Sequence, residues 1–371
     1  MHADFLQTGS LGSHIVAHLA QMSDVKTVIC LNRIATVAAT LRQQRSFELR
    51  GISLDTTSKS KLKIFETDTS KPLLGLSLDI YQNLLKNITH IIHNAWPMSL
   101  TRPVRAYESQ FKVMQNLITL AREASAQRQA TFQLGFQFIS SIGTVSYYPL
   151  WTGKALVPED PMDAASVLPV GYADAKLVCE QMLEEALKFG QFRAMAVRIG
   201  QISGSTINGY WNHVEHLAFL IKSSQTLKLL PDLKGTLSWC PVNDVAATLG
   251  ELLLSNKLSC PVYHIENPPR QPWPQMIETL ANTLDIPQGN IVPFEKWLDC
   301  VRRFPGSPSD NPAGQLIEFF SNHFIRMSCG DLILDTKNSR RHSETLRTRG
   351  PVSEELVRKY ISAWKKTGFL V

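Results

Sequence analysis

The sequence has few cysteines and no long apolar run. Its 371 residues include six cysteines without a Cys-x-x-Cys pair, so neither a disulfide framework nor a zinc site is predicted. No stretch of 18 or more apolar residues occurs, so we expect no membrane-spanning helix. Residues 1–5 lack the basic region and apolar core of a signal peptide. We therefore predict a protein of the reducing cytoplasm with free, buried thiols.

A strong excess of charge of one sign is also absent. The 38 Lys and Arg residues against 32 Asp and Glu residues give a formal net charge of +6. This mild excess suits a phosphate-bearing cofactor or an acidic partner, whereas nucleic-acid binding needs a denser basic stripe with interleaved aromatic residues. The densest basic segment, 340–349, lies among Ser, Thr and Glu residues and is predicted to be a solvated loop. No nucleic-acid partner is expected.

Apolar runs alternate with amphipathic stretches over the first two hundred residues. This order predicts a parallel sheet with helices on both faces. After Gly200 the composition changes, and the last hundred residues read as helices and loops. The expected fold class is α/β, a Rossmann-type doubly wound parallel sheet with a smaller, interleaved, α-rich C-terminal subdomain. The expected strands are 5–8, 26–31, 62–65, 88–93, 132–139, 193–199, 238–241 and 261–265, and the expected helices include 13–22, 103–126 and 172–189.

The pair Tyr172 and Lys176 is the most informative feature that is present. Four residues apart on a helix, the two side chains share one face about one turn from each other. A lysine ammonium there can hold a nicotinamide ribose and lower the pKa of the phenol, which makes the phenol a usable proton donor. The hydroxyl of Ser141 can polarise the same substrate carbonyl. The alternative is an exposed helix face with an accidental spacing, and the other motifs decide between the two.

A glycine-containing turn follows the first expected strand. It consists of Thr8, Gly9, Ser10, Leu11 and Gly12, and it opens a helix. In that setting glycines let backbone N–H groups approach a pyrophosphate at the positive end of the helix. We therefore predict that the segment binds a dinucleotide, with an ordinary strand-to-helix turn as the alternative.

Three further positions fit the same cofactor. Arg33 ends the second strand, where an acidic residue would bind a ribose hydroxyl and an arginine accommodates a 2′-phosphate. Arg33 therefore predicts NADPH over NADH, with a surface arginine as the alternative. Asp68, after the third strand, can accept a hydrogen bond from the adenine amino group, and Asn94 lies where the cofactor crosses the sheet. Both are also ordinary cap or turn residues.

No metal site is predicted. His90 and His93 are three residues apart, but on a strand this spacing places them on opposite faces. His213 and His216 can share a helix face, yet no third ligand accompanies them.

With these motifs in this order, the chain resembles the extended short-chain dehydrogenase/reductases. The finer resemblance is to the terminal thioester reductase domain of fungal nonribosomal peptide synthetases and related adenylate-forming reductases, with male-sterility-type NAD binding. It spans essentially the whole chain, and no adenylation or carrier domain is present, so a free-standing reductase or a detached fragment is expected. The segments that carry the finer match are 93–97, 197–201, 239–244, 263–268, 311–314, 327–330, 350–353 and 364–365.

The resemblance implies a reaction and a partner. NADPH reduces an acyl thioester, held on the phosphopantetheine arm of a carrier protein or synthetase, to an aldehyde and in a second round to an alcohol, in secondary metabolite biosynthesis. Tyr172 would protonate the oxygen, Ser141 would hydrogen-bond to it, and Lys176 would complete the catalytic set. Gly200 and Gln201 are cofactor-binding positions by the same resemblance. The chain is expected to be a cytoplasmic monomer.

The family pattern also predicts where the domains begin and end, and this chain differs from the pattern at one position. We expect an NADP-binding domain over 1–203, joined by strands from about 236–268, and a substrate- and carrier-facing subdomain over 204–235 and 269–371. The pattern has three glycines, and Leu6 stands where the first belongs. Two other functions therefore stay open: a reductase of a free aldehyde, ketone or acyl-CoA, and a non-catalytic or degenerate dinucleotide-binding fragment.

Overall fold

The computed structural model divides the chain into two compact units. It describes residues 2–5, 9–99, 102–129, 132–190, 192–255 and 260–371. The first unit comprises 1–200, 243–265 and 334–348, and the second comprises 201–242, 266–333 and 349–371. Residues 334–348 thus belong with the first unit and 236–242 with the second, which differs from the ranges expected from the sequence.

The first unit is built on a seven-stranded parallel sheet with the order β12-β7-β5-β4-β1-β2-β3. The order reverses between β1 and β4, as in a doubly wound sheet, so the predicted fold class is confirmed. The strands are β1 (His2–Phe5), β2 (Thr27–Arg33), β3 (Leu62–Thr67), β4 (His90–His93), β5 (Gly135–Ile139), β7 (Arg193–Ile199) and β12 (Val262–Ile265).

Two expected strands differ from those observed. The first strand is β1, which overlaps the expected range 5–8 only at Phe5; residues 6–8 lie outside the described part of the chain. The expected strand 238–241 is reduced to β11 (Cys240–Pro241), which pairs with β8 (Ile202–Ser203) in a separate two-stranded sheet. β1 has four residues and β11 has two, so the alternation of apolar and polar residues is too short in either strand to define where it begins and ends.

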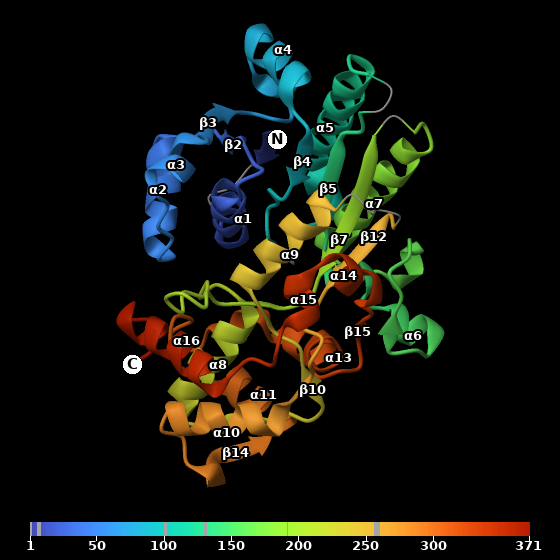
Figure 1. The fold of residues 1–371 in the computed structure, drawn as a ribbon. Helices are drawn as coiled ribbons and strands as arrows, with labels where there is room; N and C mark the ends of the chain where they lie inside the picture. The colour runs from blue at the N-terminus through green and yellow to red at the C-terminus, as the bar shows by residue number, and fades with distance from the viewer. Residues whose placement is uncertain (1, 6–8, 100–101, 130–131, 191, 256–259) are drawn as a thin grey trace. The chain divides into compact units, whose positions relative to one another are not determined.

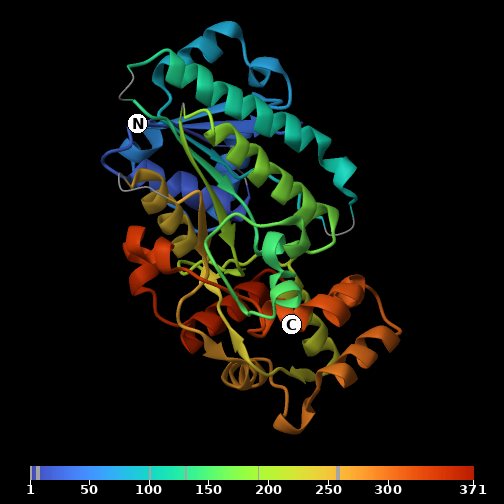
Figure 2. The same cartoon turned by 90° about the vertical axis from the view of Figure 1, so that its right-hand side faces the viewer.

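Helices cover both faces of the large sheet (Figure 1). Figure 2 shows α5 and α7 together on one face, with α1 and α9 on the other. On α5 the buried positions recur every three or four residues, from Val113 to Ala124, because one face of the helix packs on the sheet. The helices are α1 (Ser10–Gln21), α2 (Ala39–Leu49), α3 (Thr56–Ser60), α4 (Leu78–Asn87), α5 (Glu108–Ala126), α7 (Gly171–Leu187) and α9 (Val242–Leu254).

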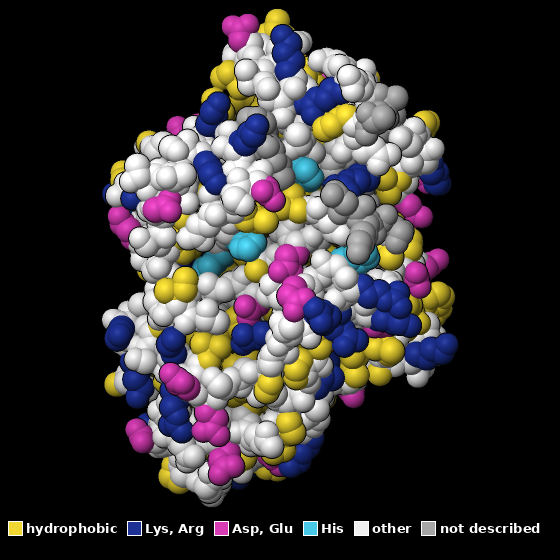
Figure 3. All heavy atoms as spheres, in the orientation of Figure 1, with side chains coloured by type: hydrophobic (Ala, Val, Ile, Leu, Met, Phe, Trp, Pro, Cys, Tyr) yellow, Lys and Arg dark blue, Asp and Glu magenta, His cyan; other side chains and the backbone are white. Residues whose placement is uncertain are grey.

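The basic segment near residue 340 forms short helices rather than the expected loop. These helices are α14 (Lys337–His342) and α15 (Glu344–Thr348). The buried carboxylate of Glu159 accepts the backbone N–H groups of Asn338 and Ser339 at 2.5 and 3.0 Å, and this contact fixes the start of α14. Lys and Arg side chains gather over α14 on the face shown in Figure 3 and point to solvent.

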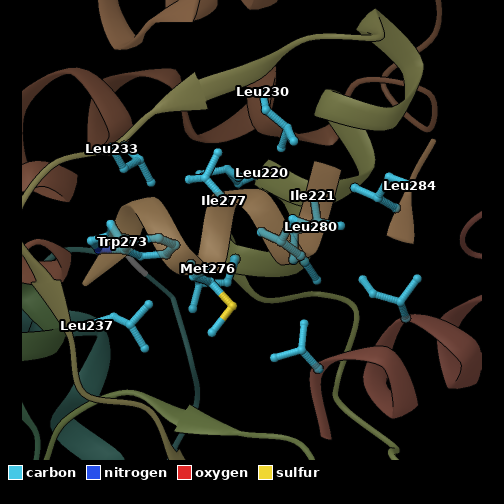
Figure 4. Close-up of a cluster of buried hydrophobic side chains, with 14 of the residues drawn as sticks. Leu220, Ile221, Leu230, Leu233, Leu237, Trp273, Met276, Ile277, Leu280 and Leu284 are labelled. Atoms are coloured by element: carbon cyan, nitrogen blue, oxygen red, sulfur yellow. The ribbon is translucent and has the colours of Figure 1, made fainter. Parts of the chain in front are cut away.

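The second unit is rich in helices. Its core brings together α8 (His216–Leu227), α10 (Trp273–Thr283) and β9 (Leu230–Asp232), and Figure 4 shows their apolar side chains converging. The remaining helices that contribute to this core include α11 (Phe294–Arg303) and α16 (Glu354–Lys366). Within the described ranges of both units, every helix is too short or too polar to cross a membrane.

Candidate active site

Two neighbouring elements of the first unit carry the predicted catalytic residues. Ser141 follows β5 and caps the 3₁₀ turn η3 (Ile142–Val145), where its Oγ accepts the Gly143 N–H at 3.1 Å. Tyr172 lies in the first turn of α7, and the Ser141 hydroxyl lies near enough to its phenol to lower the pKa of the phenol. A Cβ atom on Gly143 would lie 3.4 Å from Ser141 Oγ and 4.0 Å from the Tyr172 ring. The structure therefore brings Ser141 and Tyr172 together, with Gly143 beside both.

A glycine fixes the start of the tyrosine-bearing helix. Gly171 is the first residue of α7, and the chain at 102–104 passes very close to it. A Cβ at Gly171 would lie 2.3 Å from the Arg102 carbonyl oxygen and 2.4 Å from the Val104 nitrogen, well inside van der Waals contact. Only a residue without a side chain allows the two backbone segments to approach so closely. The close approach fixes the start of α7 and therefore the position of Tyr172, the second residue of the helix.

Lys176 is enclosed one turn further along α7, with 2% of its surface exposed. Its Nζ donates a hydrogen bond to the Ile139 carbonyl oxygen at 2.6 Å and lies 4.1 Å from the centre of the Trp96 ring and 4.8 Å from that of Phe138. Both rings stabilise a nearby cation. Burial nevertheless lowers the pKa of Lys176 to about 7, although nearby Glu180 opposes this shift. The lysine therefore titrates close to neutral pH.

The pKa of the Tyr172 phenol is shifted in the direction opposite to that expected from the sequence. Burial raises the pKa of Tyr172 to about 12, and the neighbouring Ser141 hydroxyl only partly offsets the rise. The expected lowering of this pKa by Lys176 is wrong for the chain without cofactor, because removal from water outweighs any neighbouring donor. The phenol is therefore protonated at neutral pH, which is the state that a proton donor needs.

The sequence-based prediction used the aromatic residues beside Lys176 only for the family resemblance and assigned them no function. Trp96 stacks on Tyr107 with ring centres 5.8 Å apart, and His93 stacks on Phe138 at 5.5 Å. Burial and the charge of Lys176 lower the pKa of His93 to about 3, so its imidazole is neutral. The sequence signal was Trp96 itself, which follows Asn94 in the segment 93–97, but only the fold shows that it faces the lysine.

Both ring nitrogens of His93 are buried without a hydrogen-bond partner in the described residues. Such groups are rare in proteins and are commonly satisfied by water or a ligand. His93 ends β4, next to the point where the strand order reverses, and this is where dinucleotides bind in such sheets. The residues present therefore fit a bound dinucleotide.

The glycine turn lies at the carboxyl end of β1. Gly9 is the N-cap of α1 and its carbonyl accepts the Ser13 N–H at 3.1 Å, while Gly12 is buried in the first turn of the helix. Ser10 and Leu11 begin the helix, as a phosphate-binding turn requires. The predicted residue Thr8, and with it Leu6, lies outside the described residues.

Arg33 and Asp68 lie at the same edge of the sheet. Arg33 ends β2, its side chain is exposed, and its strand partner is Thr67, which directly precedes Asp68. The Asp68 carboxylate accepts hydrogen bonds from Ser70 N at 3.1 Å and Ser70 Oγ at 2.6 Å, and these bonds lower its pKa. The structure thus places an exposed cation and a carboxylate on adjacent strand ends.

The remaining predicted cofactor residues divide between the two units. Asn94 follows β4 and Gly200 follows β7, where its N–H donates to the Ile265 carbonyl at 2.9 Å. Gln201 opens the second unit, where its Nε2 donates to the Ile202 carbonyl at 2.7 Å and to Glu215 at 3.3 Å.

The described residues contain no cluster of three or more His, Cys, Asp or Glu side chains placed to hold a metal ion.

A doubly wound parallel sheet with Ser141 and Tyr172 side by side, and with Lys176 one turn further along α7, is the arrangement of an oxidoreductase of the extended short-chain dehydrogenase/reductase class. A family model described as "Male sterility protein", an NAD-binding family, matches residues 7–249. The chain belongs to this family, and the predicted resemblance is confirmed.

Relatives among characterised proteins are polyketide synthases. The chain is 63% identical over 365 residues to the citrinin polyketide synthase of Monascus ruber, and 58% identical over 365 residues to the clavatol synthase claF of Penicillium crustosum. Each alignment covers 98% of this chain and 14% of the relative. The chain therefore spans about one seventh of the length of these relatives.

Solved structures share the fold at low sequence identity. The terminal R domain from the myxalamid PKS-NRPS pathway superimposes with a TM-score of 0.81 at 22% identity, covering 100% of this chain and 91% of that domain. The reductase (R) domain of a nonribosomal peptide synthetase from Mycobacterium tuberculosis gives a TM-score of 0.76 at 19% identity, covering 100% and 92%.

Proposed function

We propose that this chain is an NADPH-dependent reductase of an acyl thioester carried on a phosphopantetheine arm, and that it works in secondary metabolite biosynthesis. The observation that carries the proposal is the placement of Tyr172 beside Ser141, with buried Lys176 one turn further along α7. The relatives named as polyketide synthases supply the setting, because such synthases keep growing chains as thioesters. In this proposal the first unit binds the cofactor and the second recognises the acyl group and its carrier.

The residues that would hold the cofactor are those at the strand ends. The N–H groups at Gly9 to Gly12 would meet the pyrophosphate, Arg33 the 2′-phosphate and Asp68 the adenine amino group. An ammonium has three donors, and Lys176 uses one on the Ile139 carbonyl. Two donors are left for the nicotinamide ribose. Bound NADPH supplies the hydride.

The protein's part in the reaction is to manage the carbonyl oxygen and its proton. As a hydride adds to the thioester carbon, the oxygen gains charge, and the Ser141 hydroxyl stabilises that charge by a hydrogen bond. Tyr172 then donates its proton to the oxygen, which gives a thiohemiacetal. Cleavage of the carbon–sulfur bond returns the thiol, with its proton, to the carrier arm and leaves an aldehyde. A second addition to the aldehyde would give an alcohol.

The proposed function also requires a partner that carries the acyl group. The matched relatives are about seven times longer than this chain, so other parts of such synthases carry the acyl group. We infer a carrier protein as the partner, a monomeric reductase unit and a cytoplasmic location.

The test compares three substrates side by side. NADPH oxidation is followed with an acyl-pantetheine, the same acyl-CoA and the corresponding free aldehyde, using the chain and its Tyr172→Phe variant. Tyr81→Phe is the matched control, because Tyr81 lies on α4 and its hydroxyl donates to Glu123 at 2.9 Å. Turnover of the pantetheine thioester that is lost in Tyr172→Phe and kept in Tyr81→Phe supports the proposal. Turnover of the aldehyde alone indicates the alternative reductase, and NADPH binding without any turnover indicates a non-catalytic protein.

A further inference from the structure

A third side chain lies on the same face of α7 as Tyr172 and Lys176. Glu180 follows Lys176 by four residues and Tyr172 by eight, so the three lie above one another along the helix. Its carboxylate is 7% exposed, and the reaction described above does not use it. A buried carboxylate needs hydrogen-bond partners or a paired cation, and Glu180 has both.

One side of the carboxylate is held by an arginine. Arg198 on β7 is completely buried, and its Nη2 lies 2.6 Å from Glu180 Oε2 while its Nε lies 3.2 Å from both carboxylate oxygens. Arg198 Nη1 donates to the Asp160 carbonyl oxygen at 2.9 Å. The arginine therefore fixes the carboxylate from the sheet side, in a charge-assisted arrangement with several donors.

The other side of the carboxylate holds the segment that carries Ser141. The Ser140 hydroxyl donates to Glu180 Oε1, and the Thr144 hydroxyl lies 3.2 Å from the same oxygen. The Thr144 hydroxyl also lies 2.9 Å from the Ser141 carbonyl oxygen, and the Thr144 N–H donates to that carbonyl at 3.1 Å. Directly before Ser140, the carbonyl of Ile139 accepts the hydrogen bond from the catalytic lysine.

We propose that Glu180, anchored by Arg198, is a positioning residue that fixes segment 139–144 and thereby the geometry of Ser141 and Lys176. This inference rests on the proposed function, because it assigns a purpose to the same site. A purely stabilising role is the alternative. Buried ion pairs are weak sources of stability, since apolar replacements of similar volume often serve as well. The hydroxyl contacts to both ends of the segment are what a positioning role requires.

The first test replaces Glu180 by its isosteric amide. In Glu180→Gln we expect kcat for the thioester to fall about 10- to 100-fold, because misplacement of catalytic groups by about 1 Å can cost about 100-fold. KM and the Kd of NADPH should stay within about threefold. Glu251→Gln is the matched control: Glu251 accepts the hydroxyls of Ser343 and Thr345 at 2.5 and 2.6 Å in the same unit, and both partners lie outside segment 139–144. Equal effects of the two variants on kcat would overturn the proposal.

A double-mutant cycle separates positioning from general destabilisation. If Glu180 acts through the Ser140 hydroxyl, Ser140→Ala combined with Glu180→Gln should lower kcat little further than Glu180→Gln alone. Multiplicative losses would contradict the proposal. Should Glu180→Gln fail to fold, Ser140→Ala and Thr144→Val remove the two hydroxyl contacts singly, and each should lower kcat with KM unchanged.

Hydrogen exchange tests the proposal without activity. The N–H groups of Ser140, Gly143 and Thr144 are all bonded, to the Val197 carbonyl, Ser141 Oγ and the Ser141 carbonyl. In Glu180→Gln these amides should exchange at least about tenfold faster, a change that Glu251→Gln should not produce. If the unmodified chain reduces no thioester, the proposed function fails while exchange still decides the role of Glu180. Unchanged exchange in Glu180→Gln would overturn the positioning role.

Discussion

Replacing Gly171 by alanine tests whether the start of α7 sets the position of Tyr172. The added Cβ would lie 2.3 Å from the Arg102 carbonyl oxygen and 2.4 Å from the Val104 nitrogen. Normal contact is about 3.4 Å or more, so helix and neighbouring chain must separate by roughly 1 Å. Both neighbours are backbone atoms and cannot rotate away. The helix start, and Tyr172 with it, must therefore shift.

The size of the effect follows from two opposing terms. Alanine inside a helix is favoured over glycine by about 1 kcal/mol, whereas overpacking costs about 1–3 kcal/mol. We therefore expect a net loss of unfolding free energy of no more than about 2 kcal/mol. A displacement of the proton donor by about 1 Å, in contrast, should lower kcat about 100-fold. Activity should suffer far more than stability.

The assay combines thioester turnover with urea unfolding. Gly289→Ala is the matched control, because among the described residues, apart from its own chain neighbours, nothing lies within 4 Å of a Cβ built on Gly289. The control should keep its kcat within about twofold and its stability within about 0.5 kcal/mol. A Gly171→Ala variant with unchanged kcat would refute the view that this close approach places Tyr172.

Three further predictions concern the cofactor and acid stability. Arg33→Ala should erase a preference for NADPH over NADH of about 10- to 100-fold, measured as Kd by fluorescence titration; equal Kd values for the two cofactors in the unmodified chain would refute the role of Arg33. Leu6→Gly should tighten NADPH binding about tenfold, equivalent to about 1.4 kcal/mol; an unchanged Kd in calorimetry would show that the glycine register is wrong. Burial and the charge of Lys176 hold the pKa of His93 at about 3 in the folded chain against its ordinary value of 6.5, so the unfolded chain binds more protons between these pH values. Stability should therefore fall as the pH drops below about 6.5, by up to about 1.4 kcal/mol per unit from this group, and His93→Phe should flatten the dependence in urea unfolding between pH 7 and 4.5; identical slopes would contradict the assignment.

The sheet and its main helices could be predicted because their signals are local. The strand over Arg193–Ile199 and the helix over Glu108–Ala126 follow from short-range patterns of apolar residues. Arg33 ends one predicted strand and Asp68 follows another. Their position at the carboxyl edge of the sheet could therefore be predicted without knowledge of the rest of the fold.

The features that could not be predicted depend on contacts between distant residues. Glu159 and Ser339 are 180 residues apart, and their hydrogen bonds turn an expected loop into α14. The direction of the Tyr172 pKa shift is set by burial, which no spacing reveals. The role of Trp96 beside Lys176 and the bond from Ser140 to Glu180 likewise appear only once β4, β5 and α7 are folded together.

Transfer of a labelled hydride to the thioester carbon tests the proposed chemistry most directly. The chain is incubated with an acyl-pantetheine and NADPH that carries deuterium at the transferred position of nicotinamide C4, and the products are analysed by mass spectrometry. We expect an aldehyde with one deuterium on its carbonyl carbon, formed at a rate at least about 100-fold lower in Tyr172→Phe. An unlabelled carboxylic acid, or labelled aldehyde formed equally fast without the Tyr172 hydroxyl, would contradict the assignment of this chain as a thioester reductase with Tyr172 as its acid.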